Sequence, residues 1–356
     1  MLERIGILTS GGDCQGLNAA IRGVCNSLYE YYGEGRVEIY GIIDGYKGLI
    51  NCEYKIMKPE DFSGILTKGG TILGTSRQPF KTIRVIGDDN IDKVKQMKEN
   101  YKKLRLDCLV VLGGNGSQKT ANLLSEEGLN VVSLPKTIDN DLWGTDVTFG
   151  FHSAVNIATN VIDCIHTTAM SHSRIFIVEL MGHKTGWLTL YSGIAGGADV
   201  ILIPEIPYRM EAILKTLSMR RQQGKKYSII AVAEGAVSSD MYKDYRKDKK
   251  LQLESTISNK LAQDIQYETG QEVRVTVPGH FQRGGSPCPY DRILATRFGA
   301  AAAKLIRNRE YGKMVAMKNQ KIVAVDLEDI AGKLKTVPTD SSIIRCAQDT
   351  GICLGK

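Results

Sequence analysis

The chain has 356 residues, of which 42% are hydrophobic and 24% are charged, as is typical of a soluble globular protein of two domains. The net charge of +7 is spread along the chain without aromatic residues between basic patches, which argues against nucleic-acid binding. No stretch approaches the roughly 18 apolar residues of a membrane span, and the N-terminus lacks a signal-peptide pattern. We therefore expect a cytoplasmic protein with no membrane partner.

Apolar runs alternate with helical patterns along most of the chain. Strands are predicted at 4–10, 37–43, 108–114, 130–135, 174–180, 200–205, 228–235 and 272–279, and a hairpin at 314–327. Helices are predicted at 17–32, 89–103, 150–171, 209–224, 253–269 and 290–308. Nearly continuous hydrophobic strands are typical of sheets covered on both faces, so the pattern predicts an α/β fold with mostly parallel sheets. The charged run at 243–250 is expected to be a loop or an exposed helix face.

Cysteine and histidine give no sign of a metal site. The eight cysteines form no CxxC pair, and the five histidines lack ligand spacing. Several cysteines lie in apolar runs, so we expect reduced, partly buried thiols.

Glycine-rich segments follow several of the predicted strands, where ligands of open parallel sheets bind. Glycine lets backbone N–H groups approach a ligand closely, and a helix N-terminus favours anions. The segments are SGGDCQGLN (10–18), GGTILGTSR (69–77), GGNGSQKT (113–120), PKTIDND (135–141), MGHKTGW (181–187), AEG (233–235) and PGHFQRGG (278–285). With the nearby arginines, they predict a basin for two phosphorylated ligands.

Two common nucleotide motifs are missing from these segments. GGNGSQKT lacks the P-loop spacing, and SGGDCQGLN lacks the GxGxxG pattern of dinucleotide-binding proteins. A dehydrogenase that uses NAD is therefore disfavoured.

The ordered set of segments resembles the phosphofructokinase A family from about residue 4 to 310. The tail DSSIIRCAQDTGICLGK resembles the longer members of the mixed-substrate branch of these 6-phosphofructokinases. The resemblance implies two Rossmann-like three-layer domains with mostly parallel sheets and an active site in the cleft between them. It implies a larger ATP-binding domain at 1–140 plus about 256–308. A smaller sugar-phosphate domain is implied at 141–255 plus about 309–356.

The family's reaction is phosphoryl transfer from ATP to the 1-hydroxyl of fructose 6-phosphate, a step of glycolysis that gives fructose 1,6-bisphosphate and ADP with Mg²⁺. Alone, PKTIDND would be typical of a polar turn. In this context the resemblance makes Asp139 the general base and Asn115 and Asp141 the residues that support Mg²⁺. The matching ATP-binding positions are Gly12, Arg77, Gln78, Gly114, Asn115, Gly116 and Ser117.

The resemblance also supplies the sugar-phosphate site. Its positions are Thr137, Ile138, Arg174, Met181, Gly182, His183, Glu234, Arg274, His280, Phe281, Gln282 and Arg283. In the family, the arginines at 174 and 274 serve a neighbouring subunit's site, so a homodimer or homotetramer with shared sites is expected.

Three positions depart from the family pattern. Asn115 stands where ATP-using relatives often carry aspartate, and an uncharged amide binds a hard cation less strongly. His183 replaces an arginine, and Lys184 follows it as a possible substitute cation. Lys136 is the residue of pyrophosphate users, whereas Gly116 leaves room for the α-phosphate of ATP.

We expect ATP to be the donor, because a lysine side chain can swing aside and an aspartate at 116 is absent. A pyrophosphate-dependent phosphotransferase is the alternative. Another sugar phosphate, such as tagatose 6-phosphate or sedoheptulose 7-phosphate, would suit the same residues. The lost charges at 115 and 183 also leave open a catalytically weak regulatory protein that binds sugar phosphate.

Overall fold

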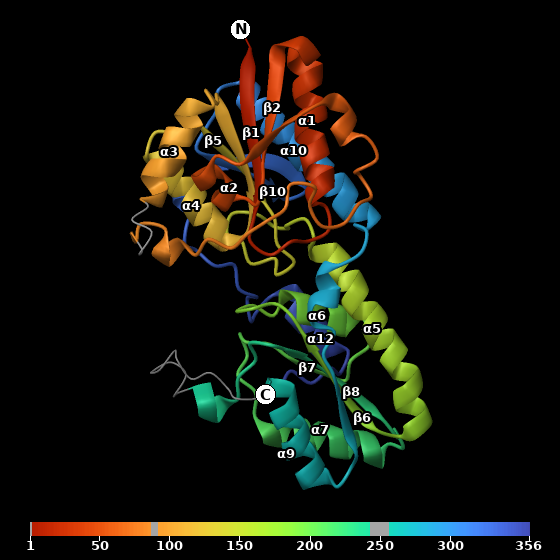
Figure 1. The fold of residues 1–356 in the computed structure, drawn as a ribbon. Coiled ribbons are helices and arrows are strands. Elements are labelled where there is room, and N and C mark those ends of the chain that lie inside the picture. Colours follow the sequence, from red (N-terminus) through yellow and green to blue (C-terminus); the bar gives the residue numbers. More distant parts are fainter. Residues whose placement is uncertain (1, 87–91, 243–255) are drawn as a thin grey trace. The chain divides into compact units, whose positions relative to one another are not determined.

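The computed structural model describes residues 2–86, 92–242 and 256–356, which divide into two compact units. Figure 1 shows the elements of each unit. The charged run predicted at 243–250 and the start of the helix predicted at 89–103 lie outside the described residues.

The first unit contains a seven-stranded sheet of order β11-β10-β5-β4-β1-β2-β3. The pairs from β10 to β2 are parallel, whereas the outer strands β3 and β11 are antiparallel to their neighbours. Its strands are β1 (Glu3–Ser10), β2 (Val37–Ile42), β3 (Tyr54–Met57), β4 (Cys108–Gly113), β5 (Val131–Pro135), β10 (Lys313–Lys318) and β11 (Lys321–Asp326). The predicted hairpin is confirmed: Asn319 and Gln320 both have positive φ, as a two-residue type I′ turn requires.

Helices cover both faces of this sheet (Figure 1). One face carries α1 (Leu17–Tyr32) and α10 (Pro289–Arg307), which pack closely against each other. The other face carries α2 (Tyr46–Asn51), α3 (Lys93–Lys103), α4 (Asn115–Glu126) and α11 (Leu327–Ile330). Buried aliphatic side chains of the strands pack against the helices on both faces of the sheet. The carboxyl ends of the strands therefore form a firmly packed edge from which the loops extend.

The contact between α1 and α10 depends on glycine. A Cβ atom at Gly299 would lie 2.5 Å from the carbonyl oxygen of Ala20. We predict that Gly299→Ala lowers the free energy of unfolding by about 1–3 kcal/mol, because the backbones must separate. Urea denaturation measures the loss. Gly35→Ala is the matched control, since no atom lies within 4 Å of a Cβ placed on Gly35, and equal stability of the two variants would contradict the prediction.

The second unit contains a four-stranded parallel sheet of order β7-β8-β6-β9. Its strands are β6 (Ile175–Leu180), β7 (Val200–Leu202), β8 (Ser228–Ala233) and β9 (Val273–Thr276). One face packs against α5 (Phe151–His172), α6 (Trp187–Ala195) and α12 (Ser342–Asp349), and the other against α7 (Met210–Gln222) and α9 (Ile257–Thr269). The chain end lies along β7, where the N–H of Ile201 donates to the carbonyl oxygen of Cys353 (2.9 Å).

The predicted fold class is confirmed, but the predicted domain boundaries were wrong in three places. Residues 256–282 belong to the second unit, because β9 pairs with β6. Residues 309–335 belong to the first unit, because β10 pairs with β5. The first unit also includes Leu142–Ser153, whereas Asp139–Asp141 belong to the second. All eight cysteines are free, and Cys14, Cys25 and Cys108 are buried.

Candidate active site

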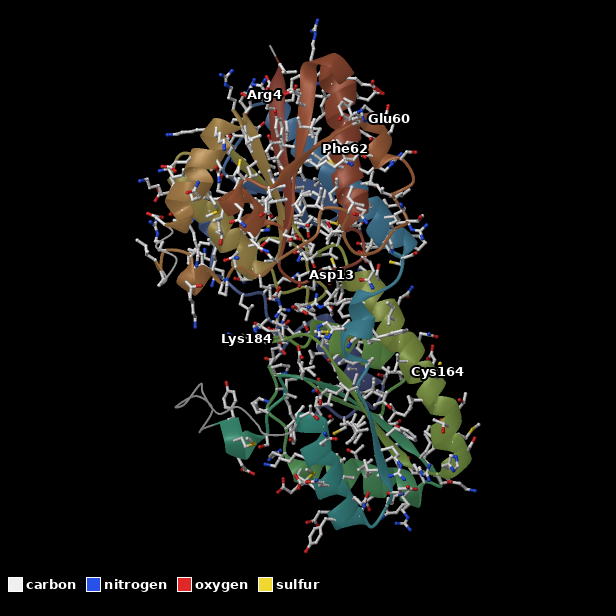
Figure 2. The ribbon with its side chains drawn as sticks, in the orientation of Figure 1. Arg4, Asp13, Glu60, Phe62, Cys164 and Lys184 are labelled. Carbon is white, nitrogen blue, oxygen red and sulfur yellow. The ribbon has the colours of Figure 1, made fainter. Side chains whose placement is uncertain are left out.

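The turn after β1 is fixed by a glycine and by the segment that ends at Arg77. Gly11 has a φ of +82°, its N–H donates to the carbonyl oxygen of Ser76 (3.0 Å), and Thr75 Oγ1 donates to its carbonyl oxygen (2.7 Å). The structure therefore brings together the two glycine-rich segments 10–18 and 69–77. Arg77 is exposed and Gln78 is half-buried. Figure 2 labels Asp13 in this turn.

Two cations contact the carbonyl groups of the same turn. Arg283 Nη1 donates to the carbonyl oxygen of Asp13 (2.9 Å), and the ammonium of Lys136 donates to that of Gly12. A Cβ atom at Gly12 would lie 3.0 Å from Arg283 Nη1. Lys136 is only 2% exposed, so it does not swing aside into solvent as expected from its length. The arrangement places buried positive charge where an anionic ligand would approach the strand ends.

The N-terminus of α4 adds a second anion-binding feature to the first unit. No acidic residue lies in its first turn, and its N-cap, Gly114, has no side chain to satisfy the free N–H groups. Such groups, with the helix dipole, bind phosphates. Gly116 is exposed, and no atom lies within 4 Å of a Cβ placed there, whereas Ser117 is buried. Asn115 Nδ2 donates to the carbonyl oxygen of Lys333 (2.8 Å), which leaves its amide oxygen as an acceptor for a ligand.

The segment after β5 contributes to both units. Thr137 and Ile138 belong to the first unit, where Thr148 Oγ1 donates to the carbonyl oxygen of Thr137 (2.7 Å). Asp139 belongs to the second, where its carbonyl oxygen accepts from Thr185 Oγ1 (3.2 Å). Asp141 is 7% exposed. The predicted base is thus fixed through its backbone by a threonine of the loop after β6.

Three predicted sugar-binding segments meet in the second unit. Glu234, after β8, accepts hydrogen bonds from the N–H groups of Gly182 (3.2 Å) and His183 (2.7 Å). Gln282 Oε1 accepts from the N–H of Met181 (3.3 Å). The loop after β6 is therefore held from both sides, and Lys184 is exposed on it (Figure 2). Phe281 and His280 are both exposed in the segment that precedes Gln282.

Arg174 and Arg274 form a separate cluster. Both guanidinium groups pair with Glu272, whose carboxyl pKa is lowered mainly by the hydrogen bond from Arg174. Arg174 precedes β6, whereas Met181 follows it, and this separation spans roughly 20 Å at about 3.3 Å per residue. Arg274 lies opposite Phe176, near the same end of β6. Within one unit, the structure does not bring these arginines to the strand-end loops.

No group of three or more histidine, cysteine, aspartate or glutamate side chains is placed to hold a metal in the parts of the chain that the structure describes. Mg²⁺ rarely needs such a cage, because it binds through one or two protein oxygens together with phosphates and water. The oxygen groups of Asn115 and Asp141 suit that mode of binding. Among the described residues, no helix is long and apolar enough to cross a membrane.

Comparison with known proteins identifies the family. A family model described as phosphofructokinase matches residues 4–306. The chain belongs to the phosphofructokinase family. It is 57% identical to the ATP-dependent 6-phosphofructokinase of Spirochaeta thermophila, over 98% of this chain and 97% of that one. It is 50% identical to ATP-dependent 6-phosphofructokinase 3 of Bacteroides thetaiotaomicron, over 99% of this chain and 100% of that one.

A solved phosphofructokinase has the same fold. The crystal structure of the Pichia pastoris phosphofructokinase in the T-state matches 99% of this chain with a TM-score of 0.81 and 32% identity. This chain spans only 37% of the length of that one.

Sequence reasoning missed several residues that organise this phosphofructokinase site. Thr75, Thr148 and Thr185 donate to backbone carbonyl groups of the predicted binding segments. Glu205, at the end of the run VILIPE, binds the N–H of Gly186. The position of Glu205 at the end of an apolar run is a signal that could have identified it. The threonines have no such signal of their own and could be suspected only from the residues beside them in the sequence.

Proposed function

We propose that the protein is an ATP-dependent 6-phosphofructokinase that transfers the γ-phosphoryl group of ATP to the 1-hydroxyl of fructose 6-phosphate. The observation that carries the proposal is the 57% identity, over nearly the whole of both chains, to a protein of that name. The strand-end loops support it, because those of the first unit offer N–H groups and a cation suited to phosphates, and those of the second form a loop, held by Glu234 and Gln282, that suits a sugar.

We assign the donor to the first unit. The backbone around Gly12, the N-terminus of α4 and the cation Lys136 offer N–H groups and positive charge for the phosphates of ATP. The open space at Gly116 leaves room for the α-phosphate. Arg77 is exposed and is assigned to the transferring group, where an arginine suits bidentate contact with phosphate.

We assign the sugar to the second unit and the general base to Asp139. Its carboxylate would accept the proton of the 1-hydroxyl as the oxygen attacks the γ-phosphorus. The loop Met181–His183, held by Glu234 and Gln282, would contact the sugar ring. Asn115 and Asp141 would supply oxygen ligands for Mg²⁺, whose charge would be partly neutralising for the transferring group.

Arg174 and Arg274 lie too far along β6 to reach the loop at Met181 in their own unit. We infer that they bind the sugar 6-phosphate of a second copy of the chain, whose site they complete. The enzyme is then a homo-oligomer, and its monomer is inactive.

The donor assignment is tested with purified enzyme, fructose 6-phosphate and Mg²⁺, with ATP and pyrophosphate supplied separately. We expect faster turnover with ATP. Faster turnover with pyrophosphate would show that Lys136 outweighs the open space at Gly116. No turnover with either donor, together with retained sugar-phosphate binding, would favour a regulatory protein.

The shared site is tested by hybrid oligomers. Asp139→Asn and Arg274→Ala subunits, each with its own tag, are co-expressed, and hybrids are purified on both tags. If Arg274 serves the partner's site, each hybrid pair has one intact site and should show about half the wild-type activity, although both parents are nearly inactive. If Arg274 served its own subunit's site, both sites of a hybrid would be defective and no activity would return.

A further inference from the structure

Thr185 links the predicted base to the sugar-binding loop. Its side chain is fully buried, and Oγ1 lies 3.2 Å from the carbonyl oxygen of Asp139 and 3.3 Å from that of Gly182. Its own N–H donates to the carbonyl oxygen of Gly182 (3.0 Å). One residue thus fixes the backbone of Asp139 and closes the turn that begins at Gly182.

Gly182 can close this turn only because it lacks a side chain. It has a φ of +148°, and a Cβ atom placed on it would lie 2.5 Å from the carbonyl oxygen of Thr185. The glycine at position 182 is therefore required for this turn.

Glu205 holds the next residue of the loop. Both of its carboxylate oxygens lie 3.0 Å from the N–H of Gly186, which caps α6. A Cβ atom at Gly186 would lie 2.8 Å from Glu205 Oε2, so the carboxylate is in tight contact with the backbone. Burial raises the pKa of Glu205, and its N–H partners offset part of that effect.

The same carboxylate also binds the C-terminal segment. The N–H of Val337 donates to Glu205 Oε1 (2.9 Å), and Val337 is itself buried. A continuous series of hydrogen bonds and adjacent residues therefore runs from Val337 through Glu205, Gly186 and Thr185 to Asp139. All five residues belong to the second unit.

We propose that Thr185 and Glu205 are positioning residues, which hold the backbone of Asp139 and the Gly182–Gly186 loop in the arrangement needed for phosphoryl transfer. The proposal rests on Asp139 being the general base. It makes the C-terminal segment, through Val337, a support of the site as well as a part of the fold. Met181, Gly182 and His183 are also held by Glu234 and Gln282, whereas Thr185 holds the backbone of Asp139, so we expect the effect to fall on turnover more than on sugar binding.

The main test replaces Thr185 by valine, which has the same shape but no hydroxyl. We expect Thr185→Val to lower kcat about 10-fold, because small misplacements of a reacting group reduce rate steeply. The dissociation constant for fructose 6-phosphate, measured by calorimetry, should change less than about 3-fold, which is small beside the effect on turnover. Thr185→Ser keeps the hydroxyl and should restore most of kcat.

Glu205 is tested by a matched pair. Glu205→Gln keeps an oxygen that can accept from both Gly186 and Val337, whereas Glu205→Ala keeps none. We expect near-normal kcat for the glutamine variant and a loss of about 3- to 10-fold for the alanine variant, since the loop loses its support. Thermal unfolding is measured on every variant.

Wild-type turnover in Thr185→Val would overturn the proposal. An equal loss of kcat in Thr185→Ser would also overturn it. So would a loss of kcat in Thr185→Val that is matched in size by a lower melting temperature and weaker sugar binding. Asp139→Asn is measured in parallel. If it keeps wild-type activity, the assignment of the base fails; if it is inactive while Thr185→Val is normal, only the positioning role fails.

Discussion

Asp139→Asn should lower kcat about 10³-fold, within the range that a general base contributes. Asparagine has nearly the same shape and keeps the backbone carbonyl that accepts from Thr185, so the loop should stay in place. The amide cannot take the proton of the sugar hydroxyl. Steady-state kinetics with saturating ATP and fructose 6-phosphate measures the loss.

The control for this variant is binding. Calorimetry should give a fructose 6-phosphate dissociation constant within a few-fold of wild type, since the variant removes proton transfer and not the contacts of the sugar. Asp163→Asn is a matched control, because Asp163 is an exposed aspartate of α5 and lies in none of the predicted binding segments. Substantial turnover in Asp139→Asn, or an equal loss in the control, would contradict the assignment.

Gly116→Asp should raise the KM for ATP about 100-fold. A carboxylate about 5 Å from a phosphate charge costs roughly 3 kcal/mol at an effective dielectric constant near 20. The variant should fold normally, because no atom lies within 4 Å of the new Cβ and an acid in the first turn of α4 favours the helix dipole. With Lys136 already present, it should also raise activity with pyrophosphate relative to ATP.

Gly116→Ala separates charge from size at this position. Its methyl group fits the same open space, so the KM for ATP should stay within a few-fold of wild type. Melting temperatures of both variants should match or exceed that of the wild type. An equally impaired alanine variant would show that any side chain blocks the nucleotide, and an unaffected aspartate variant would place the α-phosphate elsewhere.

Much of the fold could be predicted from the sequence because its signals are local. Runs such as CLVVLGG are apolar on both faces, which indicates buried strands. Buried strands that alternate with helical patterns are compatible with few folds other than an α/β fold with a parallel sheet. The ends of the strands could also be predicted, because glycine and polar residues interrupt these apolar runs. The short strand β3 was missed because three of its four residues, YKI, are exposed and carry no burial signal.

What the sequence left undetermined depends on long-range pairing. Nothing near β9 or β10 indicates which sheet each joins, so the boundaries at 282 and 335 required the observed pairs. The position of Lys136 could not be predicted either. The length of its side chain suggested that the ammonium could move into solvent. Instead the ammonium is buried and donates to the carbonyl oxygen of Gly12, which is more than a hundred residues away in the sequence.

The outer strands β3, β11 and β7 bear on whether another copy of the enzyme could add a strand to a sheet. β3 has four residues and carries Lys55, and β11 carries Lys321 and Asp326 at its two ends. In the second unit, the backbone of Cys353 occupies the edge of β7. Short, charged or covered edges resist the addition of a strand from another molecule. Polymerisation by strand addition is therefore disfavoured at β3, β11 and β7.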